Sequence, residues 1–513
     1  MKGRSRRHND RPDTRMPLMI PSETELEEFS MAIVKHLSGI RHRIGWLIGI
    51  AVLITVGIVA PCFASETGGL NEPPPAMPIR LDAETPLPTT APIPVTIDLQ
   101  DGSCQLYRGG EPYFIKGVGG RRHLDMAAEA GANSVRSWSS RDAGDLLDRA
   151  MGCGMTVMLG TWLSHDRADY LDPDYKSLKR YEIQQSLDHY KNHPALLMWA
   201  LGNEINLRGA NTPEAWQFVN EMARLIKSKD PHHPVVSVIT YSASTLDNIA
   251  KYAPDLDAVG INAYGALSSV REMVDATTYK GPYIITEWGV DGHWEADRTD
   301  WGRPIEPTSA QKADFHLQRY GQNILANRDR CLGSYVFVWG QKQERTPTWY
   351  SMFIENLPGI DLPKVSCPTV DAMHFNWSGN WPVNQAPKVD GMTINGFVAA
   401  GGVRLTPGEP FVAQVAAADP ENDGLRYVWE LMEEPTVLGV GGSFEPRPGA
   451  LGNIVDGRLP ELNLMAPEIN GEYRLYVYVL DEKGHVGTAN IPFQVDQPPA
   501  QDVAARQTPA SDS

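Results

Sequence analysis

Residues 197–206 read LMWALGNEIN, an uncharged apolar run that leads directly into Gly202, Asn203 and Glu204. Such a run is typical of a strand that is buried on both faces. A carboxylate buried without a partner is costly or changes its pKa, so strands rarely end this way. Two interpretations are open here. Glu204 either caps a following helix or meets solvent, or it belongs to a functional site at the end of the strand.

Length and composition set the first limits. The chain has 513 residues, enough for two or three domains, one of which can be a complete barrel. Its apolar content of 42% and charged content of 21% are ordinary for a globular protein. The net charge of −17 argues against a nucleic-acid-binding surface, which needs clustered basic residues.

The first hundred residues predict export. Residues 44–64 form an uncharged stretch long enough to cross a hydrocarbon core. Arg41 and Arg43 precede it, and the next basic residue is Arg80, which places the rest of the chain outside. We therefore expect a cytoplasmic or signal-peptide tail over 1–43, a signal or transmembrane segment over 44–64, and a Pro-rich linker over 65–94. Cleavage and membrane anchoring both remain open.

The positions of the cysteines predict no particular disulfide, and the sequence contains no recognisable metal-binding motif. Cys104, Cys153, Cys331 and Cys367 follow the exported segment and are permitted to form disulfides, with no pairing implied by their spacing. The chain has no C-x-x-C or H-E-x-x-H motif, so we expect neither a zinc site nor a cofactor.

The central part of the chain alternates apolar runs with amphipathic helical patterns. Eight such runs predict a (β/α)8 barrel over residues 95–382, with its last helix near 368–377. An open doubly wound sheet is the alternative, but no glycine-rich phosphate turn supports it. The predicted strands are 113–118, 133–138, 155–163, 196–203, 235–241, 258–265, 283–289 and 334–340.

Active sites of such barrels lie where the strands end, and polar or aromatic residues stand at six of these ends. We expect them to converge on one site. They are Arg136, Trp138, Trp162, His165, Asn203, Glu204, Asn262, Tyr264, Glu287, Trp288, Trp339 and Gln341.

Two of these residues are carboxylates on strands four and seven. A pair of carboxylates that flanks one bond is the equipment of glycoside hydrolysis. Arg136 and the Tyr264 hydroxyl are expected beside Glu287 and would stabilise it as an anion, whereas Glu204 has no obvious cation nearby. We therefore predict that Glu287 is the nucleophile and Glu204 the acid/base.

The motifs LGNE (201–204) and TEWG (286–289) resemble those of clan A retaining glycoside hydrolases, and most closely the barrel of glycoside hydrolase family 2. The resemblance implies that Asn203 binds the sugar 2-hydroxyl and that Arg136 and Tyr264 contact the nucleophile. It also implies that Trp339 floors the subsite of the cleaved sugar and that His165 is the strand-three histidine. Members of this family carry two further domains before the barrel, where a membrane segment and a linker are expected here.

Additional tryptophans are expected near the same rim and favour a groove for several sugar residues, since sugar rings stack on aromatic faces. They are Trp162, Trp288, Trp294, Trp301 and Trp349. Lys342, Glu344 and Arg345 are interpreted as a solvated loop, with binding of a charged sugar as the alternative.

After the barrel the pattern changes to strands without helices. Residues 387–496 predict an antiparallel β-sandwich and resemble immunoglobulin-like modules of the polycystic kidney disease type, in ADPENDGLRYVWEL and GEYRLYVYVLDEKG. The acidic turn at 419–423 is either a calcium site or, as we favour, a polar turn. Residues 497–513 are expected to be disordered.

The sequence thus predicts an exported retaining β-glycoside hydrolase that acts on a β-glucan-like oligo- or polysaccharide. The expected partner is this carbohydrate, with no nucleic acid and with membrane contact only through 44–64 if that segment is uncleaved. Two alternatives remain: a transglycosylase on the same substrates, and a catalytically inactive carbohydrate-binding surface protein.

Overall fold

The computed structural model describes residues 91–100, 102–355, 365–439, 444–452 and 455–496. All of them belong to one compact unit, Gly68–Ser513. The segments predicted over 1–43 and 44–64, most of the 65–94 linker, and the tail over 497–513 lie outside the described residues. Within the described part of the chain, no helix is long and apolar enough to span a bilayer.

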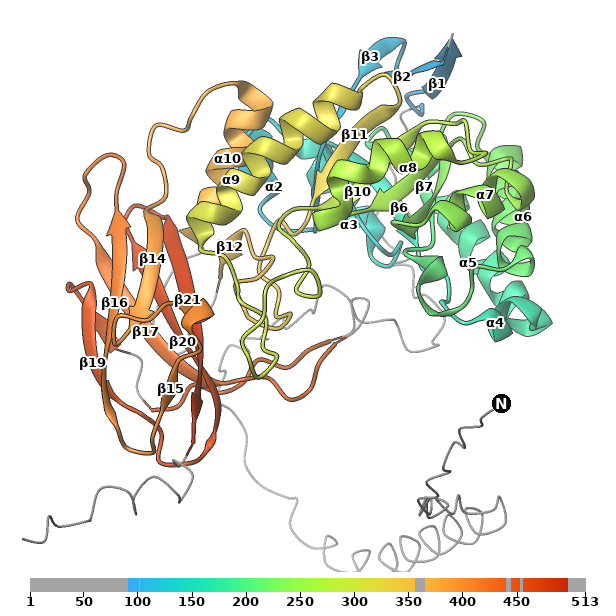
Figure 1. The fold of residues 1–513 in the computed structure, drawn as a ribbon. Helices are drawn as coiled ribbons and strands as arrows, with labels where there is room; N and C mark the ends of the chain where they lie inside the picture. The colour runs from blue at the N-terminus through green and yellow to red at the C-terminus, as the bar shows by residue number, and fades with distance from the viewer. Residues whose placement is uncertain (1–90, 101, 356–364, 440–443, 453–454, 497–513) are drawn as a thin grey trace, which may run out of the picture. The chain divides into compact units, whose positions relative to one another are not determined.

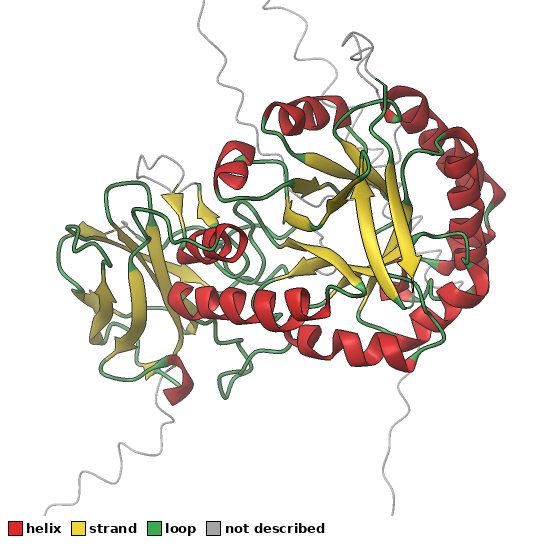
Figure 2. Ribbon diagram, turned by 90° about the horizontal axis from the view of Figure 1, so that it is seen from above, coloured by secondary structure: helices red, strands yellow, loops and turns green. Residues whose placement is uncertain are grey.

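Eight parallel strands close into a barrel (Figure 2), which confirms the predicted fold of the central region. Their order around the barrel is β10-β11-β4-β5-β6-β7-β8-β9, and each predicted run overlaps one of them. Most strand residues are fully buried, which explains why the strands read as nearly continuous apolar runs. The strands are β4 Ile115–Gly119, β5 Ser134–Arg136, β6 Thr156–Thr161, β7 Leu196–Leu201, β8 Val235–Thr240, β9 Ala258–Asn262, β10 Tyr283–Trp288 and β11 Cys331–Val336.

Helices surround this barrel (Figure 1). Helix α6 shows how the sequence specifies them: the Thr212 side chain accepts the N–H of Ala215, Pro213 occupies the first turn, and the buried face carries Trp216 and Val219. The last helix lies where it was predicted. The helices are α2 Leu124–Glu129, α3 Ala143–Gly152, α4 Arg167–Leu171, α5 Pro173–Tyr190, α6 Pro213–Lys229, α7 Ala243–Tyr252, α8 Val270–Ala276, α9 Ser309–Arg319 and α10 Pro368–Ser378.

Two details at the barrel's edges differ from the prediction. A small antiparallel sheet precedes the barrel, formed by β1 Val95–Gln100, β2 Ser103–Arg108 and β3 Glu111–Tyr113. Gly109 and Gly110, with φ of 60° and 87°, turn the chain between β2 and β3, so Tyr113 belongs to this hairpin and not to the first barrel strand. The eighth barrel strand also begins earlier than predicted, at Cys331.

The C-terminal residues form two β-sheets around a shared core, which confirms the prediction of an all-β region. We call residues 388–495 the C-terminal β unit. The core includes Val389 and Phe411 from one sheet and Trp429, Val477 and Phe493 from the other. One sheet contains β14 Lys388–Ile394, β16 Pro410–Ala418 and β19 Glu461–Met465; the other contains β15 Arg404–Leu405, β21 Val486–Val495, β20 Gly471–Leu480, β17 Arg426–Glu433 and β18 Val455–Gly457. A two-stranded ribbon, β12 Phe353–Ile354 and β13 Val365–Ser366, lies between β11 and α10 in the sequence.

A buried polar network joins the C-terminal β unit to the barrel. The Glu306 carboxylate pairs with Lys312 of α9 and accepts a hydrogen bond from the Asn490 amide at 2.7 Å. The Arg474 guanidinium donates to the Pro304 carbonyl at 2.9 Å and to Glu434 at 2.7 Å. Because buried charges are costly to separate from their partners, this network holds the unit in one position against the barrel.

The four cysteines within the described residues, Cys104, Cys153, Cys331 and Cys367, are all free thiols. None of the permitted disulfides forms between them, so burial and polar contacts carry the stability of this part of the chain.

Barrel closure between β11 and β4 yields a stability prediction. Gly333 has a φ of 123°, and a Cβ there would lie 2.2 Å from the Ile115 carbonyl oxygen. The Gly333→Ala variant should therefore lose more than about 2 kcal/mol of unfolding free energy, measured by denaturant titration. Gly321→Ala is the matched control, since a Cβ at Gly321 meets nothing within 4 Å. Equal stability of the two variants would contradict this account of closure.

Candidate active site

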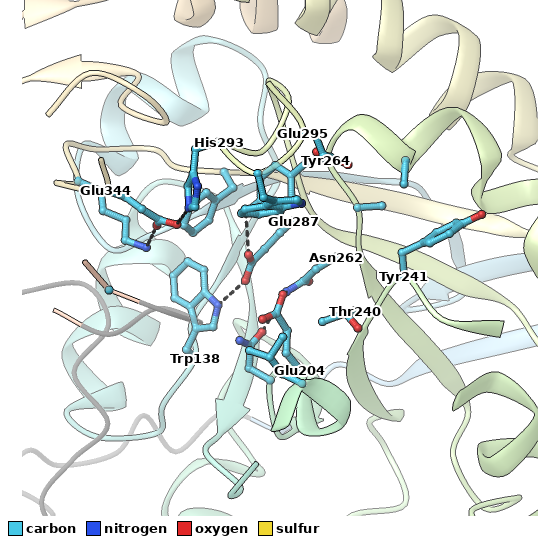
Figure 3. A pocket seen from close by; sticks show the side chains of 18 of the residues that line it. Trp138, Glu204, Thr240, Tyr241, Asn262, Tyr264, Glu287, His293, Glu295 and Glu344 are labelled. Carbon is cyan, nitrogen blue, oxygen red and sulfur yellow. Dashed lines mark hydrogen bonds and ion pairs between the residues drawn. The ribbon is translucent and has the colours of Figure 1, made fainter. Parts of the chain in front are cut away.

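A cavity of about 580 Å³ opens where the barrel strands end (Figure 3). It brings together residues from strands that are far apart in the sequence, as expected for a site at the carboxyl ends of a β/α barrel. Seven of the predicted site residues line it: Trp138, Trp162, Asn203, Glu204, Asn262, Tyr264 and Glu287.

Glu287, at the end of β10, is held by three donors. Arg136 Nη1 and Trp138 Nε1 donate to its Oε1 at 3.0 and 2.8 Å, and the Tyr264 hydroxyl donates to its Oε2 at 2.9 Å. The structure therefore places Arg136 and Tyr264 beside Glu287, as predicted, and adds Trp138 as a third donor. Both oxygens accept, so the carboxylate is fixed in one orientation toward the cavity.

Arg136 lies beneath the cavity and is only 1% exposed. Its Nη2 donates to Asn203 Oδ1 at 2.6 Å, and the same oxygen accepts from Asn262 Nδ2 at 3.2 Å. Asn262 Nδ2 also donates to Glu204 Oε1 at 2.9 Å. A continuous hydrogen-bond network therefore runs from Glu287 through Arg136 and the two amides to Glu204.

Glu204 reaches the cavity through an unusual backbone turn. Gly202 has a φ of 74° and Glu204 a φ of 51°, so the chain passes twice through the left-handed region directly after β7. A left-handed non-glycine residue costs free energy and is retained where the surrounding structure requires it. Glu204 precedes the short 3-10 helix Ile205–Arg208 but makes no capping hydrogen bond with its side chain. The capping interpretation of LGNE is therefore wrong, and the carboxyl group faces the cavity.

The two carboxyl groups have different electrostatic surroundings. Burial and the nearby charge of Glu287 raise the pKa of Glu204 to about 7, and the hydrogen bond from Asn262 opposes this shift only in part. Below about pH 7 Glu204 therefore holds its proton, whereas Glu287 faces donors on both oxygens. One cavity thus offers a proton donor and a carboxylate acceptor, which is the division of roles that acid/base and nucleophilic chemistry require.

Two predicted tryptophans do not line the cavity. Trp288 is fully buried and packs on the rings of His316 and Tyr320, because neighbouring residues of a strand point to opposite faces and Glu287 takes the inner one. Trp339 is also fully buried: its ring packs between Phe353 and Trp377, and its Nε1 donates to a backbone carbonyl.

Phe337, two residues before Trp339, lines the cavity. Of the other rim tryptophans, Trp294 lines the cavity and Trp301 and Trp349 do not. The predicted groove of five tryptophans is therefore reduced to Trp162 and Trp294, accompanied by Trp138.

His165 lies behind the cavity and not on its wall. Its Nε2 donates to the Asn203 carbonyl oxygen at 2.8 Å, and its ring lies 5.3 Å from that of Trp162. Burial lowers the pKa of His165, which favours the neutral ring with its proton on the donating nitrogen. His165 therefore positions the backbone of Asn203, and the structure gives it no direct place at the cavity.

The loop after β11 contributes three residues that the sequence analysis interpreted as solvated, with binding of a charged sugar as the alternative. Lys342, Glu344 and Arg345 all line the cavity, and their side chains are 10%, 16% and 16% exposed, so the interpretation as a solvated loop is wrong. Burial opposes ionisation of Glu344, but the hydrogen bond from His293 and the charge of Lys342 lower its pKa to about 2. Glu344 pairs with His293, about fifty residues earlier in the chain, and with Lys342 of the same irregular loop. Neither contact follows from the spacing of the residues, so only the fold reveals them.

The acidic turn of the C-terminal β unit contains hydrogen bonds of a polar turn. Asp419 Oδ1 accepts the N–H groups of Glu421 and Asp423 at 3.0 and 2.8 Å, the pattern of a polar turn. Oxygens of Asp419, Asp423 and Asp481 lie within 4.8 Å of one another, but Lys483 Nζ already pairs with Asp423 at 2.7 Å.

Removing the charge of Glu287 should lower the pKa of Glu204. The Glu287→Gln variant should move the Glu204 titration from about 7 toward the ordinary range of glutamate, because one like charge is lost. Carbon-13 NMR of protein labelled at glutamate carboxyl carbons measures this. Glu295→Gln is the control, since Glu295 lines the same cavity but accepts from the N–H groups of Gly265 and Gly292. An unchanged Glu204 titration in Glu287→Gln would contradict the coupling.

Comparison with known proteins bears on this site. Residues 148–296 match the family model described as "Glycosyl hydrolases family 2, TIM barrel domain". The matched segment contains Asn203, Glu204, Tyr264 and Glu287, the residues around which the cavity is built.

Individual relatives share about a quarter of their residues with this chain over the aligned segments. A mannan endo-1,4-beta-mannosidase F of Aspergillus clavatus is 25% identical over 199 residues, covering 33% of this chain and 45% of that protein. A beta-glucuronidase of Paenibacillus borealis is 24% identical over 276 residues, covering 45% and 43%. The chain therefore spans less than half the length of either relative. The solved structure of a beta-D-glucuronidase from Dictyoglomus thermophilum is 17% identical over 56% of this chain and 54% of that chain, with a TM-score of 0.43.

The match to this family model lies within the closed barrel and includes the two carboxyl groups at its mouth. Residues 148–296 of this chain are therefore similar to the TIM barrel domain of glycosyl hydrolases family 2.

Proposed function

We propose that this protein is a retaining β-glycoside hydrolase that cleaves O-glycosidic bonds by double displacement. The observation that carries the proposal is the contrast between the two carboxyl groups in one cavity: Glu287 accepts from three donors, and Glu204 has a pKa raised to about 7. A retaining mechanism needs this pairing of an anionic nucleophile and a protonated acid.

In the first step, an oxygen of Glu287 bonds to the anomeric carbon while Glu204 gives its proton to the departing glycosidic oxygen. The C–O bond to the leaving sugar breaks with its electron pair, and a glycosyl ester on Glu287 remains. In the second step, Glu204, now a carboxylate, takes a proton from water, whose oxygen bonds to the anomeric carbon. Glu287 leaves as the free carboxylate and regains the full hydrogen bonds of Arg136, Trp138 and Tyr264.

The hydrogen-bond network around Asn203 suggests a role in positioning the sugar. Its Oδ1 is held by both Arg136 and Asn262, which fixes the plane of the amide at the cavity wall. A fixed amide beside the acid/base can direct its amino group to one sugar hydroxyl, and such bonds strengthen as charge develops at the anomeric carbon. We propose the 2-hydroxyl as that group.

The proposed substrate is a β-linked oligo- or polysaccharide. Trp162 and Trp294 line the cavity together with Tyr241, and Trp294 is 54% exposed at the rim, where it can stack on a sugar ring. The names of the relatives suggest β-1,4-mannan beside the β-glucan-like chain that the sequence predicted. Transglycosylation differs only in that a sugar hydroxyl, in place of water, resolves the intermediate.

The sequence also supports a proposal for the setting of this enzyme. We propose export directed by residues 44–64, with the barrel on the outer side of the membrane, on the strength of the Arg41 and Arg43 asymmetry. The C-terminal β unit is proposed to be an immunoglobulin-like module of the polycystic kidney disease type, on its motif and its two antiparallel-rich sheets.

A product screen tests the proposed activity. The full-length protein is expected to release new reducing ends from at least one of β-1,4-mannan, mixed-linkage β-glucan and β-1,4-galactan, and proton NMR should show the β anomer as the first product. Initial release of the α anomer would exclude the retaining mechanism. Binding of a polysaccharide without new reducing ends or transfer products would favour the inactive binding protein.

Alanine variants test the two roles separately. With an aryl glycoside substrate, Glu204→Ala should lose about 10²–10⁴-fold in activity, and Glu287→Ala should lose more, up to about 10⁶-fold. Added azide should rescue Glu204→Ala and give a β-glycosyl azide, since azide attacks the ester on Glu287. In Glu287→Ala, any azide product should be the α anomer. The reversed pattern would exchange the roles.

A further inference from the structure

One residue in the wall of the catalytic cavity, Gly439, comes from the C-terminal β unit and not from the barrel. Gly439 and Glu445 belong to the connection between β17 and β18, and Gly439 lines the cavity. Glu445 lies just behind this wall, with its side chain fully buried. The carboxylate therefore comes from a part of the chain about 160 residues after Glu287.

The Glu445 carboxylate is saturated with hydrogen bonds from the cavity wall. Its Oε1 accepts the Arg345 backbone N–H at 2.7 Å, and its Oε2 accepts Arg345 Nη1 at 2.9 Å and the Gly439 N–H at 3.0 Å. Gln343 Nε2 lies 3.4 Å from Oε1. Glu445 thus fixes both the backbone and the charge of Arg345, which lines the cavity from the barrel side.

Arg345 and Lys342 are the two permanent cations among the described cavity-lining residues, and both are paired with carboxylates. Arg345 pairs with Glu445, and Lys342 pairs with Glu344, which also binds His293. Arg136 beneath the cavity is likewise paired, with Glu287. The lining also contains four carboxyl groups: Glu204, Glu287, Glu295 and Glu344.

This balance of charge bears on the sugar that can enter. A sugar carboxylate that loses its water needs a cation that is not already neutralised, and a nearby like charge opposes its binding. A hydroxymethyl group has no such requirement. The arrangement therefore opposes a uronic acid and accommodates a neutral hexose of the same configuration.

We propose that Glu445, contributed by the C-terminal β unit, is a specificity-determining residue that neutralises Arg345 and so restricts the cavity to uncharged sugars. The proposal rests on the glycosidase function proposed above and adds the substrate class. It also gives the C-terminal β unit a direct part in the site.

Matched substrates test this proposal. 4-Nitrophenyl β-D-glucoside and β-D-glucuronide differ only at C6, as do the galactoside and galacturonide. For the full-length wild type, kcat/KM should favour the neutral member of at least one pair by about 100-fold or more. Glu445→Gln should lower the ratio of kcat/KM for the neutral substrate to kcat/KM for the uronide by about 10-fold or more, chiefly through a lower KM for the uronide.

Two further variants make the result specific. Adding Arg345→Gln to Glu445→Gln should return the ratio to the wild-type value, because the exposed cation is removed. Glu472→Gln is the matched control: Glu472 also pairs across to the barrel, with Arg303, but does not line the cavity. Its ratio should equal that of the wild type, and thermal melting of every variant shows that each is folded.

The outcomes separate this inference from the proposed function. A wild-type preference for the uronide, or a Glu445→Gln ratio equal to the control, overturns the inference while the glycosidase stands. If no aryl glycoside is hydrolysed, calorimetric titration with mannotetraose, cellotetraose and β-1,4-linked tetramannuronate decides instead. Neutral chains that bind to the wild type, with tetramannuronate binding gained only in Glu445→Gln, support the inference without the hydrolytic function. Binding of tetramannuronate to the wild type as tight as that of the neutral chains overturns it, and binding of none overturns both.

Discussion

The arrangement of the site depends on the hydrogen bonds of the buried Arg136 guanidinium. This guanidinium lies inside the barrel mouth at 1% exposure, donates to Glu287 at 3.0 Å and Asn203 at 2.6 Å, and binds the Thr286 carbonyl at 2.7 Å. A cation in this position is stable only because a carboxylate and several oxygens surround it. One side chain from β5 therefore sets the positions of groups at the ends of β7 and β10.

The same guanidinium explains why two chemically identical side chains differ. Glu287 contacts Arg136 directly, whereas Glu204 contacts only the neutral Asn262 amide and experiences the negative charge of Glu287. Burial and like charge together keep a proton on Glu204 up to about pH 7. The strained turn at Gly202 and Glu204 is consistent with this arrangement, since it directs a carboxyl group into a cavity where a relaxed turn would direct it elsewhere.

The C-terminal β unit also contributes a charged group beside the cavity, the carboxylate of Glu445. Its contact with the barrel includes buried ionic groups of both sides: the Asn490 amide donates to Glu306, and Arg474 donates to the Pro304 carbonyl. Buried charged groups are expensive to separate from their partners, so these contacts favour one relative position. That fixed position is what allows Glu445 to reach Arg345, and a loosely tethered module could not supply a wall to the cavity.

The alternation of apolar runs and helical patterns was sufficient to predict the barrel, its eight strands and α10, because a strand buried on both faces must be apolar along its length. It was also sufficient to place Glu204 and Glu287 at one mouth, since the ends of parallel strands meet there. It was insufficient for Trp288 and Trp339, where the side of the strand and the packing of α9 and α10 determine which way a ring points. It failed for Lys342, Glu344 and Arg345, because an irregular loop carries no period from which burial can be read.

The sequence by itself determined the fold of the barrel, the presence of two glutamates at its mouth and the placement of Arg136 and Tyr264 beside Glu287. These properties follow from local pattern and from which residues end each strand. Only the tertiary structure decided that Glu204 caps nothing, that Trp138 is a third donor and that Glu445 neutralises a cavity cation. Each of these depends on a distance between groups far apart in the chain, and electrostatic energies depend on that distance and on burial, which no linear pattern encodes.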